Sequence, residues 1–221
     1  MLFSYPIQSE FGRIVPKSKI YEHAQPSAAL RDKFVKQIDK IVWQYKLSPE
    51  TVNLRAKKDV PEIEIFSITL RTPEVREEVL RCIDTAIPFP IVYELIFEGQ
   101  IKTKAAFKRP SEGDSNKWVT DIYFESGWQK ESARREVLPV ALDLSLLYEQ
   151  MLRRLMPASR KAGEDIRAQV QRLSEIRSKE NEAAKIEARM QKEKQFNRKV
   201  ELNSILRELR TAIDKLERYA D

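Results

Sequence analysis

The chain of 221 residues has little of what many enzyme sites require: five glycines, one cysteine and one histidine. Phosphate-binding loops need clustered glycines, but these five are dispersed, so no P-loop or dinucleotide fingerprint is present. A single cysteine excludes an intramolecular disulfide, and a single histidine excludes a cluster of histidine ligands. No apolar run approaches the roughly 18 residues of a membrane span. We therefore expect a cytoplasmic protein without a cofactor, a bound metal or a membrane segment.

The charge balance is moderately basic. Lys and Arg number 40 and Asp and Glu 34, a net charge of +6, and charged residues make up 33% of the chain. This fraction exceeds the usual quarter or so, which indicates a strongly solvated segment. The small positive excess permits a nucleic-acid partner but does not require one.

Residues 1–157 alternate between strand and helix patterns. Apolar residues at steps of three and four predict an amphipathic helix over residues 27–48, and strict alternation predicts a strand over residues 62–71. The other predicted elements are a helix at 73–87, a hairpin of strands at 91–97 and 101–107, a strand at 117–128 and a helix at 136–157. This order predicts an α+β fold, in which a small, mostly antiparallel sheet packs with helices.

Residues 158–221 have the composition of a long helical arm. From residue 164 to the end there is no Gly or Pro, and a continuous helix of this length would span about 87 Å at ~1.5 Å per residue. A heptad seam predicts a coiled coil that associates with a partner helix or a second copy. Its members are Leu202, Leu206, Leu209, Ile213, Leu216 and Ala220. A fold-back between residues 177 and 199 is the alternative.

Phe196 is the only aromatic residue between Tyr148 and Tyr219. At 100° per residue it lies about 120° from Leu202, with Val200 and Asn203 on its own side of the helix. It therefore heads a second patch, which either packs locally where the helix bends or docks a partner. Phe196, Val200 and Asn203 join the seam as predicted interface residues.

Several stretches resemble the bacterial family of the domain of unknown function 4391. The sharpest are "YKLSPETVNL" (45–54) and "KQFNRKVELN" (194–203). Further stretches carry the resemblance across most of the chain, among them "VPKSKIYEHA" (15–24), "VPEIEIFSITLR" (60–71) and "IDTAIPFPIVYEL" (83–95). The resemblance implies a compact α+β domain with a helical arm. It also implies a gene neighbourhood with a helicase and a DNA methyltransferase, in restriction-modification-like antiphage defence islands.

Basic residues supply the candidates for nucleic-acid contact. The strand at 101–107 reads as a lysine-rich, exposed sheet edge, which either contacts phosphates or discourages aggregation. The candidates are Lys102, Lys104, Lys108 and Arg109 on this strand, and Arg55, Lys57 and Lys58 in a loop.

No set of residues predicts a reaction. Glu62 and Glu64 share a strand face, but the Glu-x-Lys pair of a metal-dependent nuclease is missing. His23 has no evident partner, and Cys82 lies on the apolar side of its helix. We therefore expect a non-enzymatic accessory subunit of a DNA-processing complex that docks on a helicase or methyltransferase. A DNA-binding module is the alternative, and a divergent nuclease a weaker one.

Overall fold

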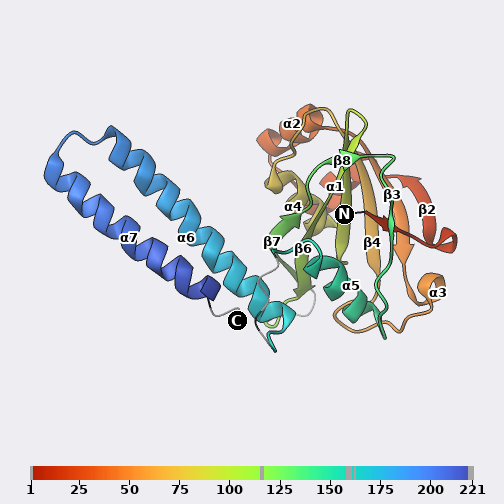
Figure 1. The fold of residues 1–221 in the computed structure, drawn as a ribbon. Helices are drawn as coiled ribbons and strands as arrows, with labels where there is room; N and C mark the ends of the chain where they lie inside the picture. The colour runs from red at the N-terminus through yellow and green to blue at the C-terminus, as the bar shows by residue number, and fades with distance from the viewer. Residues whose placement is uncertain (1, 115–116, 158–160, 162, 219–221) are drawn as a thin grey trace. The chain divides into compact units, whose positions relative to one another are not determined.

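A mixed β-sheet is the centre of the N-terminal part of the chain (Figure 1). The computed structural model describes residues 2–114, 117–157, 161 and 163–218. The sheet strands, in spatial order, are β2 (Glu10–Ile14), β3 (Ile38–Leu47), β4 (Ile63–Leu70), β5 (Ile91–Phe97), β6 (Gln100–Pro110) and β7 (Trp118–Glu125), and β8 (Gln129–Lys130) also pairs with β6. Only the β4–β5 pairing among those described in this sheet is parallel. The predicted α+β class with a mostly antiparallel sheet is confirmed.

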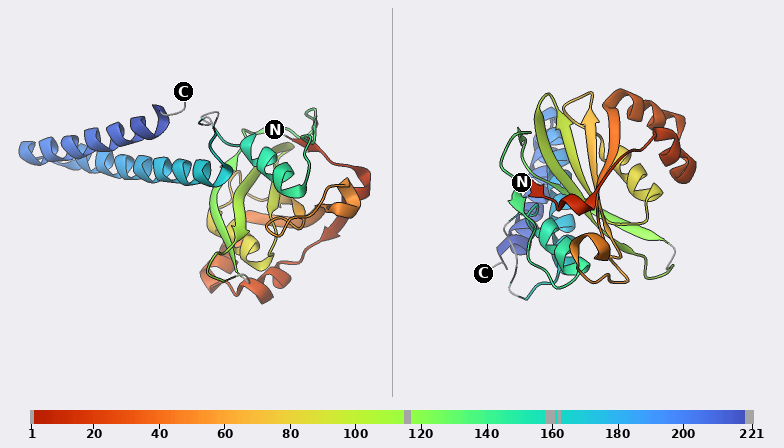
Figure 2. Two further views of the ribbon diagram at one scale, coloured as in Figure 1. Left: turned by 90° about the horizontal axis from the view of Figure 1, so that it is seen from below. Right: turned by 90° about the vertical axis from the view of Figure 1, so that its right-hand side faces the viewer.

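Helices cover both faces of this sheet. On one face lie α1 (Lys17–Ala24), α2 (Ala28–Gln37) and α4 (Glu77–Ala86), and on the other lies α5 (Leu144–Arg153) (Figure 2). We call these the α4 face and the α5 face. The remaining short elements are β1 (Phe3–Ser4), which pairs in parallel with β9 (Glu136–Val137), the 3-10 helix η1 (Ile7–Ser9) and α3 (Pro49–Val52).

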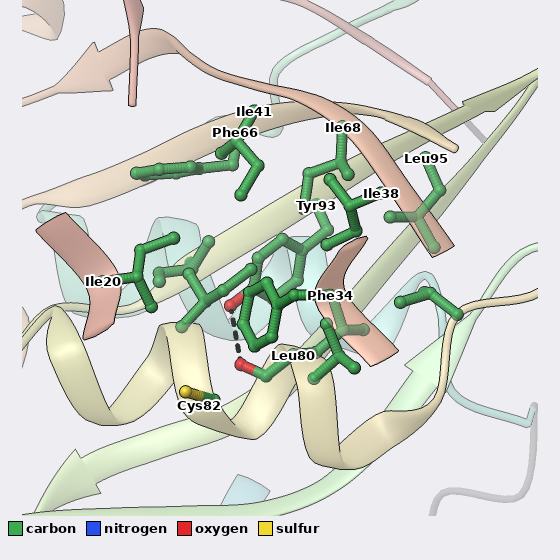
Figure 3. Close-up of a cluster of buried hydrophobic side chains, with 14 of the residues drawn as sticks. Ile20, Phe34, Ile38, Ile41, Phe66, Ile68, Leu80, Cys82, Tyr93 and Leu95 are labelled. Atoms are coloured by element: carbon green, nitrogen blue, oxygen red, sulfur yellow. Dashed lines mark hydrogen bonds between the residues drawn. The ribbon is translucent and has the colours of Figure 1, made fainter. Parts of the chain in front are cut away.

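The main apolar core lies between the sheet and the helices of the α4 face (Figure 3). Phe34 of α2 is fully buried and meets Tyr21 of α1 edge to face, with ring centroids 5.4 Å apart. Cys82 is buried at the edge of this core, as its helical position predicts. Burying this apolar surface is the dominant favourable contribution to folding.

The predicted helix over residues 27–48 is wrong in its second half. Ser27 caps α2 as expected, since its side chain accepts a hydrogen bond from the Leu30 amide at 3.3 Å. The chain then leaves the helix at Ile38 and continues directly as β3. Irregular pairing with β4, between Ile38 and Lys40 and between Trp43 and Tyr45, explains the helix-like spacing of its apolar residues.

Two further helices are shorter than predicted. The predicted 73–87 helix begins only at Glu77, and the predicted 136–157 helix begins only at Leu144. Asp143 sets the second start, because its carboxylate accepts the Leu146 amide at 2.9 Å as an N-cap. Residues 136 and 137 form β9 instead.

The C-terminal unit, residues 157–221, is a helical hairpin rather than one continuous helix. Helix α6 (Ile166–Lys192) ends before three non-helical residues, and α7 (Phe196–Arg218) returns alongside it (Figure 1). The Glu193 carboxylate accepts the amides of Lys194 and Gln195 at 2.8 and 2.9 Å, which stabilises the turn without Gly or Pro. Within the described residues, the helices are too short or too polar to cross a lipid bilayer.

Candidate functional site

Three lysines of β6 lie on the α4 face, within the sheet rather than at its edge. Strand β6 pairs with β5 on one side and with β7 on the other. The exposed fractions of Lys102, Lys104 and Lys108 are 7%, 8% and 1%. The prediction that these lysines form an exposed sheet edge is therefore wrong.

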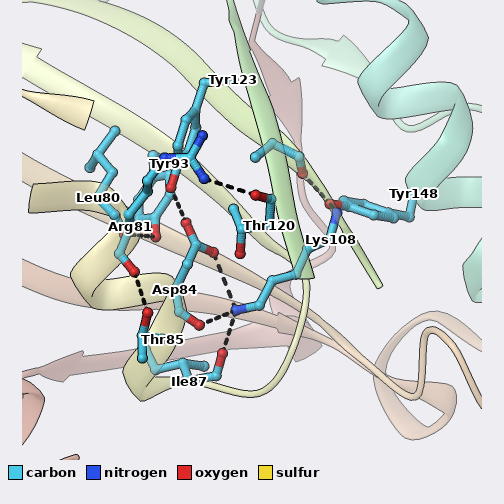
Figure 4. A network of polar contacts seen from close by, with 11 residues as sticks. Leu80, Arg81, Asp84, Thr85, Ile87, Tyr93, Lys108, Thr120, Tyr123 and Tyr148 are labelled. Atoms are coloured by element: carbon cyan, nitrogen blue, oxygen red, sulfur yellow. Dashed lines mark hydrogen bonds and ion pairs between the residues drawn. The ribbon is translucent and has the colours of Figure 1, made fainter. Parts of the chain in front are cut away.

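Lys108 closes the C-terminal end of α4 (Figure 4). Its ammonium donates to the Asp84 carbonyl at 2.5 Å and to the Ile87 carbonyl, and it lies 3.3 Å from the Asp84 carboxylate. A cation is favoured where a helix exposes its last carbonyls, and three acceptors match the three donors of an ammonium. Each of these donors is thus directed at an acceptor of this chain.

Asp84 is the acidic partner in this network. The hydroxyl of Tyr123 on β7 donates to its carboxylate. Burial raises the pKa of Asp84 and lowers that of Lys108, while the attraction between the two groups opposes both shifts. The Tyr148 hydroxyl of α5 accepts the Lys108 amide at 3.1 Å and donates to the Ala106 carbonyl. The network therefore joins α4, β6, β7 and α5.

Lys102 and Lys104 share one carboxylate. Their ammonium groups lie 3.3 and 2.9 Å from Glu125 of β7, and Lys104 also lies 3.9 Å from Glu77 of α4. The Lys102 ammonium also stands over the Trp128 ring, 4.9 Å from its centroid. These lysines thus already have anionic or aromatic partners within the chain.

The other predicted nucleic-acid contacts are scattered. Arg109 lies 3.7 Å from Asp121, and Lys57 lies 3.4 Å from Asp143. Arg55 and Lys58 are exposed in the segment between α3 and β4. The seven residues do not gather into one surface, and their contact with nucleic acid stays a prediction.

Glu64 is a buried acid on β4, opposite Lys46 of β3. It is 1% exposed, and among the described residues neither of its carboxyl oxygens has a hydrogen-bond partner. Burial, reinforced by the neighbouring Glu62, raises the pKa of Glu64 to about 9. Lys46 instead binds Glu62, at 2.5 Å. A carboxyl that holds its proton at neutral pH is a weak ligand for Mg²⁺, and the described residues hold no cluster of three or more His, Cys, Asp or Glu suited to a metal.

An apolar groove of about 400 Å³ opens on the N-terminal unit, residues 1–156. Three segments form it: the N-terminal segment around η1, α3 with the residues that follow it, and the residues that precede α5 together with Leu147 of α5. Eight of its twelve lining residues are apolar, which suits an apolar rather than a charged ligand. The apolar residues are Pro6, Val52, Leu54, Leu138, Pro139, Val140, Ala141 and Leu147.

Exposed apolar side chains accompany this groove. Val140, which lines it, is 93% exposed, and Ile7, Val137 and Leu142, each next in sequence to a lining residue, are 80–85% exposed. Exposed clusters of this kind mark interaction surfaces more often than single exposed residues do. We refer to the lining residues and these four side chains together as the apolar groove.

Local structure explains why these side chains are not buried. Residues 136 and 137 are held by β1, Pro139 prevents regular strand or helix pairing, and the helix starts only after Asp143. The stretch between them is therefore irregular and lies on the surface. Sequence reasoning missed the groove because it placed residues 136–157 in one helix, although the apolar spacing in "EVLPVALDL" fits no single helical face.

The predicted interface residues of the arm divide into two groups. Leu202, Leu206 and Leu209 pack against α6 of the same chain, on Ala183, Ile186 and Met190. Ile213 and Leu216 are half-buried, and Ala220 lies outside the described residues. The seam was predicted to face another chain, but its central part is used within the hairpin. Phe196, Val200 and Asn203 are all exposed, Phe196 by 77% and Val200 by 54%.

Comparison with known proteins gives one family match. The model of the family described as "Domain of unknown function (DUF4391)" matches residues 3–213. No curated protein and no solved structure matches.

Proposed function

Because the chain belongs to the family of the domain of unknown function DUF4391, we propose that it is a non-enzymatic accessory subunit of a bacterial DNA-processing complex. The complex is of the restriction-modification-like, antiphage type, and it works in the cytoplasm. The partner is a helicase or a DNA methyltransferase encoded beside it. The resemblance described above supplies the class of partner.

The apolar groove is the observation that carries this proposal. A polar enzyme site needs groups that can reach a substrate, whereas Lys108, Asp84 and Tyr123 are turned toward one another. The groove instead offers apolar surface. Burying one exposed Val, Leu or Ile side chain contributes about 1.5–3 kcal/mol before the costs of association are subtracted. The core of a protein interface is more apolar than its rim, and these four side chains suit such a core.

Size-exclusion chromatography with light scattering tests the proposal. The chain is co-expressed with the neighbouring helicase and methyltransferase, and the mass of each complex is measured. We expect a stable complex with at least one enzyme. The double substitution Val140→Ser, Leu142→Ser should weaken this complex at least tenfold without lowering the melting temperature.

A matched control is available on the same unit. Ile14 and Val35 are 63% and 53% exposed and do not line the groove. The double substitution Ile14→Ser, Val35→Ser also removes two exposed aliphatic side chains, and it should leave the complex intact. If neither enzyme binds the wild-type chain, the proposal is wrong.

A further inference from the structure

We propose that the tip of the helical hairpin and the adjoining exposed stripe of α7 bind a single strand of nucleic acid. Phe196 stacks on an unpaired base in this complex, and neighbouring lysines and arginines contact the phosphates. The proposal does not rest on the groove or on a partner protein. It also differs from contact through the β6 lysines, because those side chains are buried.

The tip has a strong local excess of positive charge. Residues 189–200 contain five Lys or Arg residues and one carboxylate, Glu193. Arg198 lies 3.9 Å from Glu193, but Lys192, Lys194 and Lys199 have no carboxylate within ion-pair distance among the described residues. Glu193 is itself occupied by the turn, where it accepts two backbone amides. The charge therefore remains available to an anion.

The stripe extends the tip along α7. Phe196, Lys199, Val200, Asn203 and Arg207 are exposed. Successive turns carry Phe196, then Lys199 and Val200, then Asn203 and Arg207, three or four residues apart, so all five lie on one side of the helix. From the first to the last this side is about 16 Å long at ~1.5 Å per residue. The tip and this side together present Lys192, Lys194, Lys199 and Arg207, which can contact about four phosphates. No carboxylate lies on this side between Phe196 and Arg207.

Two unfavourable features of α7 are explained by such a ligand. Arg198 and Lys199 occupy the first turn of α7, where the helix dipole disfavours cations. Phe196 exposes 77% of its surface at the same place. A polyanion with stacking bases compensates for both, because phosphates neutralise the cations and a base covers the ring. A protein interface suits this surface less well, since interface cores are depleted in lysine.

Fluorescence anisotropy with a labelled 20-nucleotide poly(dT) strand tests the proposal on the full chain. About four phosphate contacts predict a single-strand salt slope near −3, so affinity should fall about 50-fold between 50 and 200 mM salt. Phe196→Ala should weaken binding by roughly 5- to 150-fold, the range of one lost base stack. Phe196→Trp should retain binding and show quenched fluorescence when the strand is added.

Charge reversal separates a local site from bulk charge. Lys192→Glu, Lys194→Glu and Lys199→Glu together should remove binding at 200 mM salt and make the salt slope shallower by about two. The matched control reverses Lys36, Lys40 and Lys130, which are exposed in the N-terminal unit and are not among the candidate nucleic-acid contacts. Each reversal removes two charges, so three of them take either variant from +6 to zero. The control should keep most of the affinity.

Three outcomes would overturn the proposal. They are no salt-sensitive binding of the strand by the wild-type chain at 50 mM salt, equal losses in the two triple variants, and binding of anionic phosphatidylglycerol vesicles without binding of the strand. Full affinity in Phe196→Ala would overturn the stacking role of this residue. Complex formation with the neighbouring enzymes should be unchanged in the tip variants, so failure here and failure of the groove proposal are distinguishable.

Discussion

Lys108 and Asp84 form a buried ion pair that fastens the end of α4 to the middle of the sheet. The Lys108 ammonium and the Asp84 carboxylate are 3.3 Å apart, and the two residues are 1% and 3% exposed. The same ammonium binds the Asp84 and Ile87 carbonyls. One group thus both neutralises the Asp84 carboxylate and caps the C-terminal end of α4. Removing either partner leaves a charge inside the protein.

Lys108→Met should therefore lower the free energy of unfolding by about 3–5 kcal/mol, the usual cost of breaking a buried pair. Asp84 would lose its counter-ion, and the last carbonyls of α4 would lose their donor. Urea denaturation monitored by tryptophan fluorescence measures the change. Lys130→Met, at an exposed position, is the control and should change stability by less than ~0.5 kcal/mol. An equal effect of the two substitutions would contradict the role given to the pair.

Glu64 should make the stability depend on pH. Its pKa is raised from 4.5 to about 9 in the folded chain, so the folded state holds a proton that the unfolded state releases. The stabilisation linked to that proton is fully present below pH 4.5 and is lost as pH rises toward 9. Glu64→Gln removes the dependence. The variant should therefore gain stability relative to the wild type between pH 5 and pH 8, by at most about 4 kcal/mol.

Melting curves at pH 5 and pH 8 provide the measurement. Glu131→Gln replaces an exposed carboxylate and should follow the wild type at both pH values. If Glu64→Gln and the wild type kept a constant difference across this range, Glu64 would be ionised in the folded protein.

The wrong prediction of a helix over residues 38–47, which form β3, has a physical cause. In a regular strand, residues on one face are two apart. The two irregularities of β3 each insert an extra residue, so one face carries Ile38, Ile41 and Trp43 and the other carries Val42 and Tyr45. Steps of three are typical of a helix, so periodicity alone predicted one. Strand β4, which has no such insertion, was predicted within a residue or two.

The break in the helical arm is a second feature that local sequence patterns did not predict. Residues 193–195 contain no Gly or Pro, and the local sequence favours a continuous helix. The break is stabilised by distant contacts, because Leu206 of α7 packs on Ala183 and Ile186 of α6. Such pairing cannot be read from helix propensity. The heptad seam itself was correctly identified, but its partner lies in the same chain.

The exposure of the β6 lysines and the apolar groove were also missed because both depend on contacts between segments that are distant in sequence. Alternation placed Lys102 and Lys104 on one face, as in the structure, but strand order decides whether β6 lies at the edge of the sheet. The later strand β7 pairs with β6 and supplies Glu125. The groove depends on three segments that are far apart in sequence, and no local signal joins Pro6, Val52 and Val140.

The hairpin offers a pair of adjacent residues for comparison. Leu206 is 3% exposed and Ile205 is 40% exposed. Leu206→Ala should destabilise the hairpin by about 2–5 kcal/mol, because it removes the centre of the α6–α7 contact. Ile205→Ala should be neutral or slightly stabilising, since Ala is the better helix former. Hydrogen exchange of the α7 amides measures both. Equal protection in the two variants would contradict the packing assigned to Leu206.

Arg135 binds a further buried carboxylate, which belongs to the sheet. Its guanidinium forms two hydrogen bonds with Glu94 of β5, at 2.6 and 3.0 Å, and donates to the Phe3 carbonyl at 2.9 Å. Glu94 is only 3% exposed, so Arg135→Met should leave an unpaired charge and cost about 3–5 kcal/mol. Arg135→Lys should lose less, although an ammonium cannot reproduce the paired geometry of the guanidinium.

The neighbouring residue gives the control for this prediction. Arg134 is exposed, and Arg134→Met should change stability by less than ~0.5 kcal/mol. Because Arg135 also binds the backbone of β1, its loss should increase hydrogen exchange at the β1–β9 pair, which lies beside the apolar groove. Urea denaturation and exchange of the Glu136 amide, which donates to the Leu2 carbonyl at 2.8 Å, measure the two effects. Unchanged exchange at Glu136 in the Met variant would show that β1 is held by its strand pairing and packing alone.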